Sequence, residues 1–173
     1  MGGGMTRVRA AIRTYLPDLV YGANDGVITT FAVVCGVVGA SLSNTVILIL
    51  GFANLVADGF SMGASNYLSR RSYPDEEQRD APAVAARHGV ATIAGFVSAG
   101  IVPLVAYLVP LPDDARFPAT IVLALGTLFT VGATRSLVTK LGWLRSGTEM
   151  FLVGAAAAVV AYGIGAFAAS FTD

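Results

Sequence analysis

The sequence predicts an all-α membrane protein with five transmembrane helices. Of its 173 residues, 55 % are hydrophobic and only 13 % are charged, which is about half the charge of a typical soluble domain. The mean hydropathy is +0.70. The apolar residues gather in five blocks, each long enough for the roughly 20 residues that a helix needs to cross the hydrocarbon core. Almost nothing is left for a soluble domain, so residues 1–173 are expected to form a single transmembrane domain.

The predicted spans follow one another with short connections. The first is no cleaved signal peptide, because it is long, carries Asn24 and Asp25, and precedes four more spans. Residues 70–88 form a short cytoplasmic linker, and residues 1–4 resemble a cloning remnant before a native start at Met5. The five spans are predicted at Leu19–Ser41, Thr45–Ser69, Gly89–Val109, Ala119–Thr139 and Gly147–Phe171.

The distribution of basic residues predicts the orientation. All but one of the 11 lysines and arginines fall in the N-terminal arm, between spans two and three, or at the end of span four and in the loop that follows it. Arg116 alone belongs to the opposite side. Because cytoplasmic loops are enriched in Lys and Arg, the N-terminus is predicted to be cytoplasmic and the C-terminus outside. An odd number of spans agrees with this.

Composition also excludes several functions. Eleven basic residues balance eleven acidic ones, so no net charge attracts nucleic acid. A lone Cys35 forms no internal disulfide, and no Cys/His cluster marks a zinc or iron–sulfur site. The common catalytic motifs and the phosphate-binding loop are missing. We therefore expect neither an enzyme nor a prosthetic group, and a proton-coupled or passive carrier rather than an ATP-driven pump.

Polar residues inside the first span indicate a pathway. Ionisable residues are costly in a membrane and usually mark a site. Asp25 lies about 12 Å from the predicted cytoplasmic edge, at 1.5 Å per residue, and Asn24 precedes it. Asp18 lies two turns earlier on the same face. It is expected to guide ions in from the cytoplasm.

The second span carries a matching stripe. Asn54, Asp58, Met62 and Asn66 recur at steps of four residues, which places them along one side of a helix. If the first two spans pack together, carboxylates, amides and a thioether converge inside the bilayer. Oxygen ligands suit hard divalent cations and a thioether suits softer ones. The set therefore favours Fe²⁺, Mn²⁺, Co²⁺ or a neighbour such as Zn²⁺.

These observations predict a metal site. Asp25, Asp58 and Met62 form its core, with Asn54 and Asn24 as supporting ligands. A buried carboxylate can take up a proton when the metal leaves, so both acids would couple metal to protons. An ion with about six ligands needs more than two helices supply, and a twofold homodimer could complete the set. Other polar residues have structural explanations, since Cys35 is expected to pack in the core and His88 to lie at the interface.

Several segments together resemble the vacuolar iron transporter family. The resemblance covers nearly the whole chain and is most specific in the first two spans. The matching segments are Asp18-Leu-Val-Tyr-Gly-Ala-Asn-Asp-Gly26, Thr30-Phe-Ala-Val-Val34, Gly36-Val-Val-Gly-Ala40, Gly59-Phe-Ser-Met-Gly63, Tyr67-Leu-Ser69, Pro103, Gly132-Ala-Thr-Arg135 and residues 147–165.

The resemblance implies a five-span homodimer that exports Fe²⁺, and sometimes Mn²⁺, from the cytosol in exchange for protons. It also implies roles for Asp25 and Met62, which match the family's aspartate and methionine. Two departures stand out. The family's span-two glutamate is Asn54 here, and Asp58, one turn on, is expected to replace it. The chain also lacks the cytoplasmic metal-binding domain that many members insert after span two.

The sequence thus predicts a divalent-metal exporter in a multi-pass membrane, compatible with the plasma membrane of a bacterium. Two alternatives stay open. A membrane metal sensor or scaffold would bind metal without moving it, which the Asn54 substitution allows. A carrier of another small cation would use Asp25 and Asp58 as counter-charges.

Overall fold

Five long apolar helices confirm the predicted fold class. The computed structural model describes residues 2–137 and 141–171, and no strand occurs in this part of the chain. The helices long and apolar enough to cross a membrane cover Thr14–Gly39, Asn44–Arg71, Pro82–Leu108, Asp113–Leu137 and Trp143–Ala169. The elements in chain order are α1 (Gly2–Gly39), α2 (Asn44–Arg71), η1 (Glu76–Gln78), α3 (Pro82–Gly100), η2 (Val102–Leu104), α4 (Val105–Leu108), α5 (Asp113–Thr134), η3 (Arg135–Leu137) and α6 (Trp143–Ala169).

The observed starts of two helices, α3 and α1, differ from the starts predicted from the sequence. The helix α3 begins at Pro82 rather than at Gly89, because a proline lacks the N–H that the first helical turn leaves unpaired anyway. The linker between the second and third spans therefore shrinks to residues 72–81. The helix α1 extends back to Gly2, so residues 2–4 are helical.

The third span is broken rather than continuous. It ends as an α-helix at Gly100, passes through the 3₁₀ turn η2 and resumes briefly as α4. Pro103 lies inside this turn, where its missing N–H and its ring disfavour a regular α-helix.

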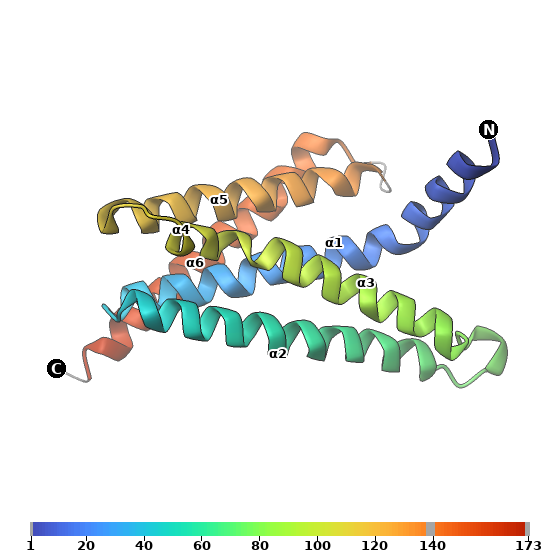
Figure 1. The fold of residues 1–173 in the computed structure, drawn as a ribbon, viewed down its shortest axis with the longest axis horizontal. Helices are drawn as coiled ribbons and strands as arrows, with labels where there is room; N and C mark the ends of the chain where they lie inside the picture. The colour runs from blue at the N-terminus through green and yellow to red at the C-terminus, as the bar shows by residue number, and fades with distance from the viewer. Residues whose placement is uncertain (1, 138–140, 172–173) are drawn as a thin grey trace.

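The first helix occupies the centre of the bundle and packs against α3, α6, α5 and α2 (Figure 1). Its contact with α3 is close enough for backbones to touch. A Cβ atom added at Gly22 would overlap the carbonyl oxygen of Thr92, and one at Gly26 would overlap that of Phe96. Small residues allow this approach between membrane helices. Many large apolar side chains on α2 and α6 instead face outward, for example Phe60 and Val159 at 70 % and 74 % exposure.

The two ends of the bundle differ in charge. The start of α1, the α2–α3 connection and the α5–α6 connection lie at one end, and the α1–α2 turn and the α4–α5 connection lie at the other (Figure 1). The first end carries most of the basic residues used to predict the orientation. The five spans place the N- and C-terminal ends of the chain on opposite sides, while the side that faces the cytoplasm stays a prediction.

Candidate metal site

The helices α1 and α2 bring the two intramembrane carboxylates near each other. Asp25 and Asp58 are both half-buried, and the charge of Asp58 acts on Asp25. Neither side chain forms a hydrogen bond or ion pair within the described residues. Thr29, one turn from Asp25, donates its hydroxyl to the backbone oxygen of Asp25 at 2.8 Å and so leaves the carboxylate free. Two acids without a basic partner at this depth require a cation or a proton.

Met62 and Asn54 lie on the same stripe of α2 as Asp58. Both are half-buried. Met62 also packs against the apolar cluster that includes Leu55 and Phe96, so its thioether contributes to the core as well as to the stripe. Within the described part of the chain, the Nδ2 atom of Asn54 is buried and has no hydrogen-bond partner. An unpaired buried amide is uncommon and calls for a functional or solvent partner.

Asn24 stands apart from this group. Its Oδ1 atom is also buried without a partner. However, consecutive helical residues are rotated by about 100° around the axis, so the side chains of Asn24 and Asp25 leave α1 in different directions. The structure therefore places Asp58 of the α2 stripe within electrostatic range of Asp25, and it leaves Asn24 on a different flank of α1.

The ligands of one chain form only part of a metal site. In the described part of the chain, no group of three or more His, Cys, Asp or Glu side chains is placed to hold a metal ion. Two carboxylates, a thioether and an amide fall short of the six or so ligands that octahedral divalent ions prefer.

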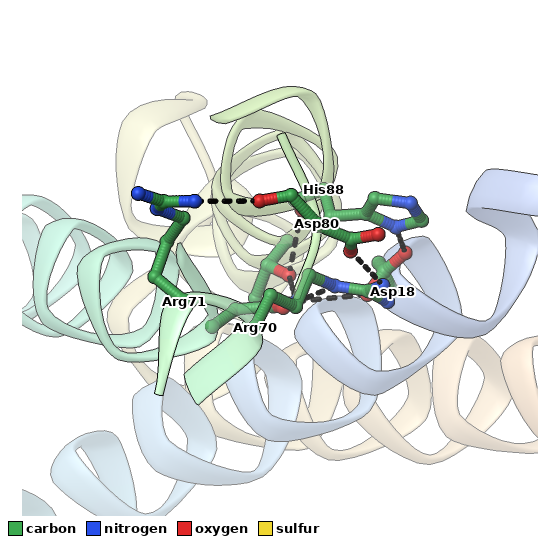
Figure 2. Close-up of polar contacts among 7 residues, drawn as sticks. Asp18, Arg70, Arg71, Asp80 and His88 are labelled. Carbon is green, nitrogen blue, oxygen red and sulfur yellow. Dashed lines mark hydrogen bonds and ion pairs between the residues drawn. The ribbon is translucent and has the colours of Figure 1, made fainter. Parts of the chain in front are cut away.

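Asp18 belongs to a separate polar network between α1, α2 and α3 (Figure 2). Its side chain is buried, with 6 % of its surface exposed. One oxygen, Oδ1, accepts a hydrogen bond from Asn66 Nδ2 at 2.8 Å and pairs with Arg70 at 3.4 Å. The other, Oδ2, lies 2.5 Å from His88 Nδ1. Both oxygens of the residue predicted to guide ions are thus occupied.

Arg70 extends this network to the α2–α3 connection. Its Nε donates to Asn66 Oδ1 at 3.0 Å, and its Nη1 pairs with Asp80 Oδ2 at 3.0 Å. Asn66 also donates to the Thr92 hydroxyl at 2.7 Å. Figure 2 shows Arg71 beside this group, where it donates to the backbone oxygen of Asp80 at 2.8 Å. The network therefore fastens three helices at the end of the bundle that we predict to be cytoplasmic.

Sequence reasoning missed this network. His88 was expected at the interface, whereas its side chain is buried, at 5 % exposure, against Asp18. Asn66 was expected on the metal stripe and instead joins Asp18. Seventy residues separate Asp18 from His88, and no local pattern connects them. Cys35 is buried in the core, as predicted.

These features define a multi-pass α-helical membrane protein in which two neighbouring spans each carry an acid that has no ion-pair partner among the described residues. The family model described as the VIT family matches residues 16–83 and 74–166. The chain belongs to the VIT family, which confirms the resemblance drawn from its motifs.

Named relatives lie in plants and parasites. The chain is 28 % identical to "Vacuolar iron transporter homolog 1" of Oryza sativa, over 94 % of this chain and 77 % of the relative. It is 24 % identical to "Vacuolar iron transporter 1" of Eucalyptus grandis, over 85 % and 84 %. A shorter match to "Vacuolar iron transporter" of Toxoplasma gondii is 43 % identical over 70 residues, which covers 38 % of this chain and only 23 % of that relative.

Proposed function

We propose that this protein transports a divalent transition metal, first of all Fe²⁺, out of the cytosol in exchange for protons. The observation that carries the proposal is the pair Asp25 and Asp58, two half-buried carboxylates on adjacent spans with no partner among the described residues. Their mutual repulsion inside the membrane is relieved by one divalent cation or by protons. Membership of the VIT family and relatives named iron transporters support iron as the cargo.

The same geometry supports exchange of metal for protons. When a divalent cation binds between Asp25 and Asp58, both carboxylates must be ionised. When the cation leaves, protons restore neutrality at lower cost than two bare charges. The half-buried Met62 and Asn54 lie on the same stripe and would add a soft sulfur and an amide oxygen, a set that accommodates Mn²⁺, Co²⁺ and Zn²⁺ as well as Fe²⁺. Asn24 enters the ligand set only if its amide reorients around α1.

A homodimer would complete the coordination. One chain supplies fewer ligands than an octahedral ion prefers, and a twofold axis beside α1 and α2 would double the set. We propose the plasma membrane of a bacterium as its location on composition alone. The named relatives come from plants and parasites.

Asp18 would act at the entrance of the pathway by exchanging its partner Arg70 for an incoming cation. Arg70 now neutralises Asp18 and Asp80 together. An incoming cation that takes the place of the guanidinium at Asp18 would leave Arg70 paired with Asp80. The entrance role of Asp18 therefore requires movement of Arg70.

One observation favours a second candidate, a metal sensor or scaffold. Asn54 stands where the family resemblance places a glutamate, and an amide cannot ionise. A chain that had lost this acid could bind metal at Asp25 without releasing it to the other side.

Flux measurements separate the two. The purified protein is reconstituted into vesicles loaded with a metal-sensitive dye, and Fe²⁺ and Mn²⁺ entry is followed with and without a pH gradient. We expect flux that rises with the gradient and that is lost in Asp25→Asn, with Asp114→Asn as the control for a carboxylate at the end of a span. Metal binding without flux in the parent would establish the sensor instead.

A further inference from the structure

A groove between α1 and α3 lies outside the metal site and outside the Asp18 network. It has a volume of about 390 Å³ and is lined by Tyr15, Ala86, Arg87, Val90, Ala91 and Ala94. All but Arg87 and the hydroxyl of Tyr15 are apolar. Val90 is 64 % exposed, so the groove opens to the surroundings of the bundle rather than to its core.

Arg87 is a free cation at one end of this groove. It is exposed and forms no hydrogen bond or ion pair with any residue of the described ranges. Arg70, Arg71, Arg79 and Arg145 all have partners. The guanidinium of Arg87 is therefore available to a group outside the described residues.

The depth of the groove matches the boundary of a bilayer. The third span covers Pro82–Leu108, which is 27 residues, or roughly 40 Å at 1.5 Å per residue. The hydrocarbon core is about 30 Å thick, so the first turns of α3 extend into the headgroup region. Arg87 lies in those turns. Ala91 and Ala94 lie one and two turns further along α3, toward the acyl chains.

The α1 wall of the groove is fixed. The ring of Tyr15 lies 4.9 Å from the ring of His88, and His88 is held by Asp18. Tyrosine is favoured at the membrane interface, where its ring is apolar and its hydroxyl polar. The groove therefore combines an apolar surface, the hydroxyl of a Tyr15 ring held in place by packing, and the unpaired guanidinium of Arg87.

We propose that this groove binds one anionic phospholipid, with its phosphate on Arg87 and Tyr15 and an acyl chain along Val90, Ala91 and Ala94. Basic pockets between transmembrane helices on the cytoplasmic side are suited to anionic headgroups. Charge complementarity selects the anionic headgroup, and the apolar floor selects a lipid over a soluble phosphate. The site is independent of metal transport.

Native mass spectrometry of the detergent-solubilised protein tests this directly. Phosphatidylglycerol, phosphatidylcholine and glycerol 3-phosphate are titrated separately into the parent, Arg87→Gln, Ala94→Phe and Arg145→Gln. Arg145 is an exposed arginine in the first turn of α6 and pairs with Glu149. This helix starts at the same end of the bundle (Figure 1), so Arg145 serves as the matched control. All three substitutions lie on exposed positions, and circular dichroism checks that each variant is folded.

We expect the parent to bind phosphatidylglycerol more tightly than phosphatidylcholine and not to bind glycerol 3-phosphate. Arg87→Gln should weaken phosphatidylglycerol binding about fivefold or more, the loss of one interfacial charge contact. Ala94→Phe should weaken both lipids because it fills the groove. The Arg145→Gln variant should bind phosphatidylglycerol with the same affinity as the parent.

Three results would overturn the proposal. Equal loss in Arg87→Gln and Arg145→Gln would indicate a general surface-charge effect. Binding of glycerol 3-phosphate as tight as that of the lipid would assign the site to a soluble phosphate. Loss of dimer with lipid binding intact in Ala94→Phe would assign the groove to a second copy of the chain.

Discussion

At the scale of single residues, the proposed metal site depends on which position of α2 carries a carboxylate. Asn54 occupies the position at which the family resemblance places a glutamate, and Asp58 lies one turn closer to the predicted cytoplasmic end. The charge of Asp58 lies within range of Asp25, whereas Asn54 is uncharged and its buried Nδ2 atom has no hydrogen-bond partner among the described residues. We therefore propose Asp58 as the residue of α2 that shares a cation with Asp25.

Two variants test whether Asp58 replaces the glutamate that the family resemblance places at position 54. Asp58→Asn should lower Mn²⁺ flux by about 10- to 100-fold, the usual range when a residue that supports metal binding is lost. Adding Asn54→Glu to that variant should restore part of the flux, because the acid returns to the same stripe one turn away. Asn54→Glu alone checks that the new side chain is tolerated. Parent-level flux in Asp58→Asn would remove Asp58 from the site.

The residues of the candidate site stay a prediction, and they stand out in the sequence because membrane-buried acids are rare. Asp25, Asp58 and Met62 are recognisable from their depth and spacing alone. The partners of Asp18 were not, because His88 and Arg70 approach it only after three helices pack. The direction of Asn24 also depends on which side of α1 each neighbour occupies.

At the scale of elements, the Asp18 network should hold α1 to α2 and α3. Asp18→Ala leaves His88, Asn66 and Arg70 without their shared acceptor. Removing one partner of a buried ion pair typically costs about 3–5 kcal/mol, so the melting temperature in detergent should fall clearly.

Asp113→Ala is the matched control for that change. Asp113 pairs with Arg116 at 2.7 Å, but its side chain is 82 % exposed. An exposed pair of this kind contributes about 1 kcal/mol or less, despite the shorter distance. If the two variants melt at the same temperature, the network does not fasten the helices.

Close approach of α1 and α3 gives a second prediction about elements. Gly22→Ala forces a Cβ atom onto the Thr92 carbonyl oxygen, and overpacking of this kind costs about 1–3 kcal/mol. Gly126→Ala on α5 meets no atom within 4 Å and should keep or slightly raise the stability, since alanine favours helix. Thermal unfolding followed by circular dichroism distinguishes them. Equal destabilisation by both would mean that the α1–α3 contact is not this tight.

At the scale of the whole molecule, the orientation can be tested with the native cysteine removed. In a Cys35→Ala background, Gln78→Cys reports the α2–α3 connection and Ser43→Cys reports the α1–α2 turn. The connection around residue 78 belongs to the side that carries all the lysines and arginines but Arg116. A membrane-impermeant thiol reagent should therefore label Gln78→Cys only from the cytoplasmic side. It should label Ser43→Cys only from the other side. The reverse pattern would invert the direction of transport proposed here.

The number and order of the spans were predictable from the sequence, because each hydrophobic block is long and separated by short polar turns. The positions of the helix ends were harder to predict from the sequence. The start of α3 at Pro82 and its break at Pro103 depend on backbone geometry that hydropathy does not record. The central place of α1 follows from glycine contacts such as Gly22 with Thr92, which spacing indicates without naming the partner helix.

Mn²⁺ binding by the purified dimer or monomer, followed by electron paramagnetic resonance, tests the central claim most directly. The claim is that Asp25 and Asp58 bind one ion together. Affinities are measured for the parent, Asp25→Asn, Asp58→Asn, the double variant and the control Asp114→Asn. Each single substitution should weaken Mn²⁺ binding about tenfold or more. Because residues that share one ion are strongly coupled, the double variant should bind Mn²⁺ only slightly more weakly than the single variant with the lower affinity. Unchanged affinity in either single variant, or fully additive losses in the double variant, would contradict a shared site.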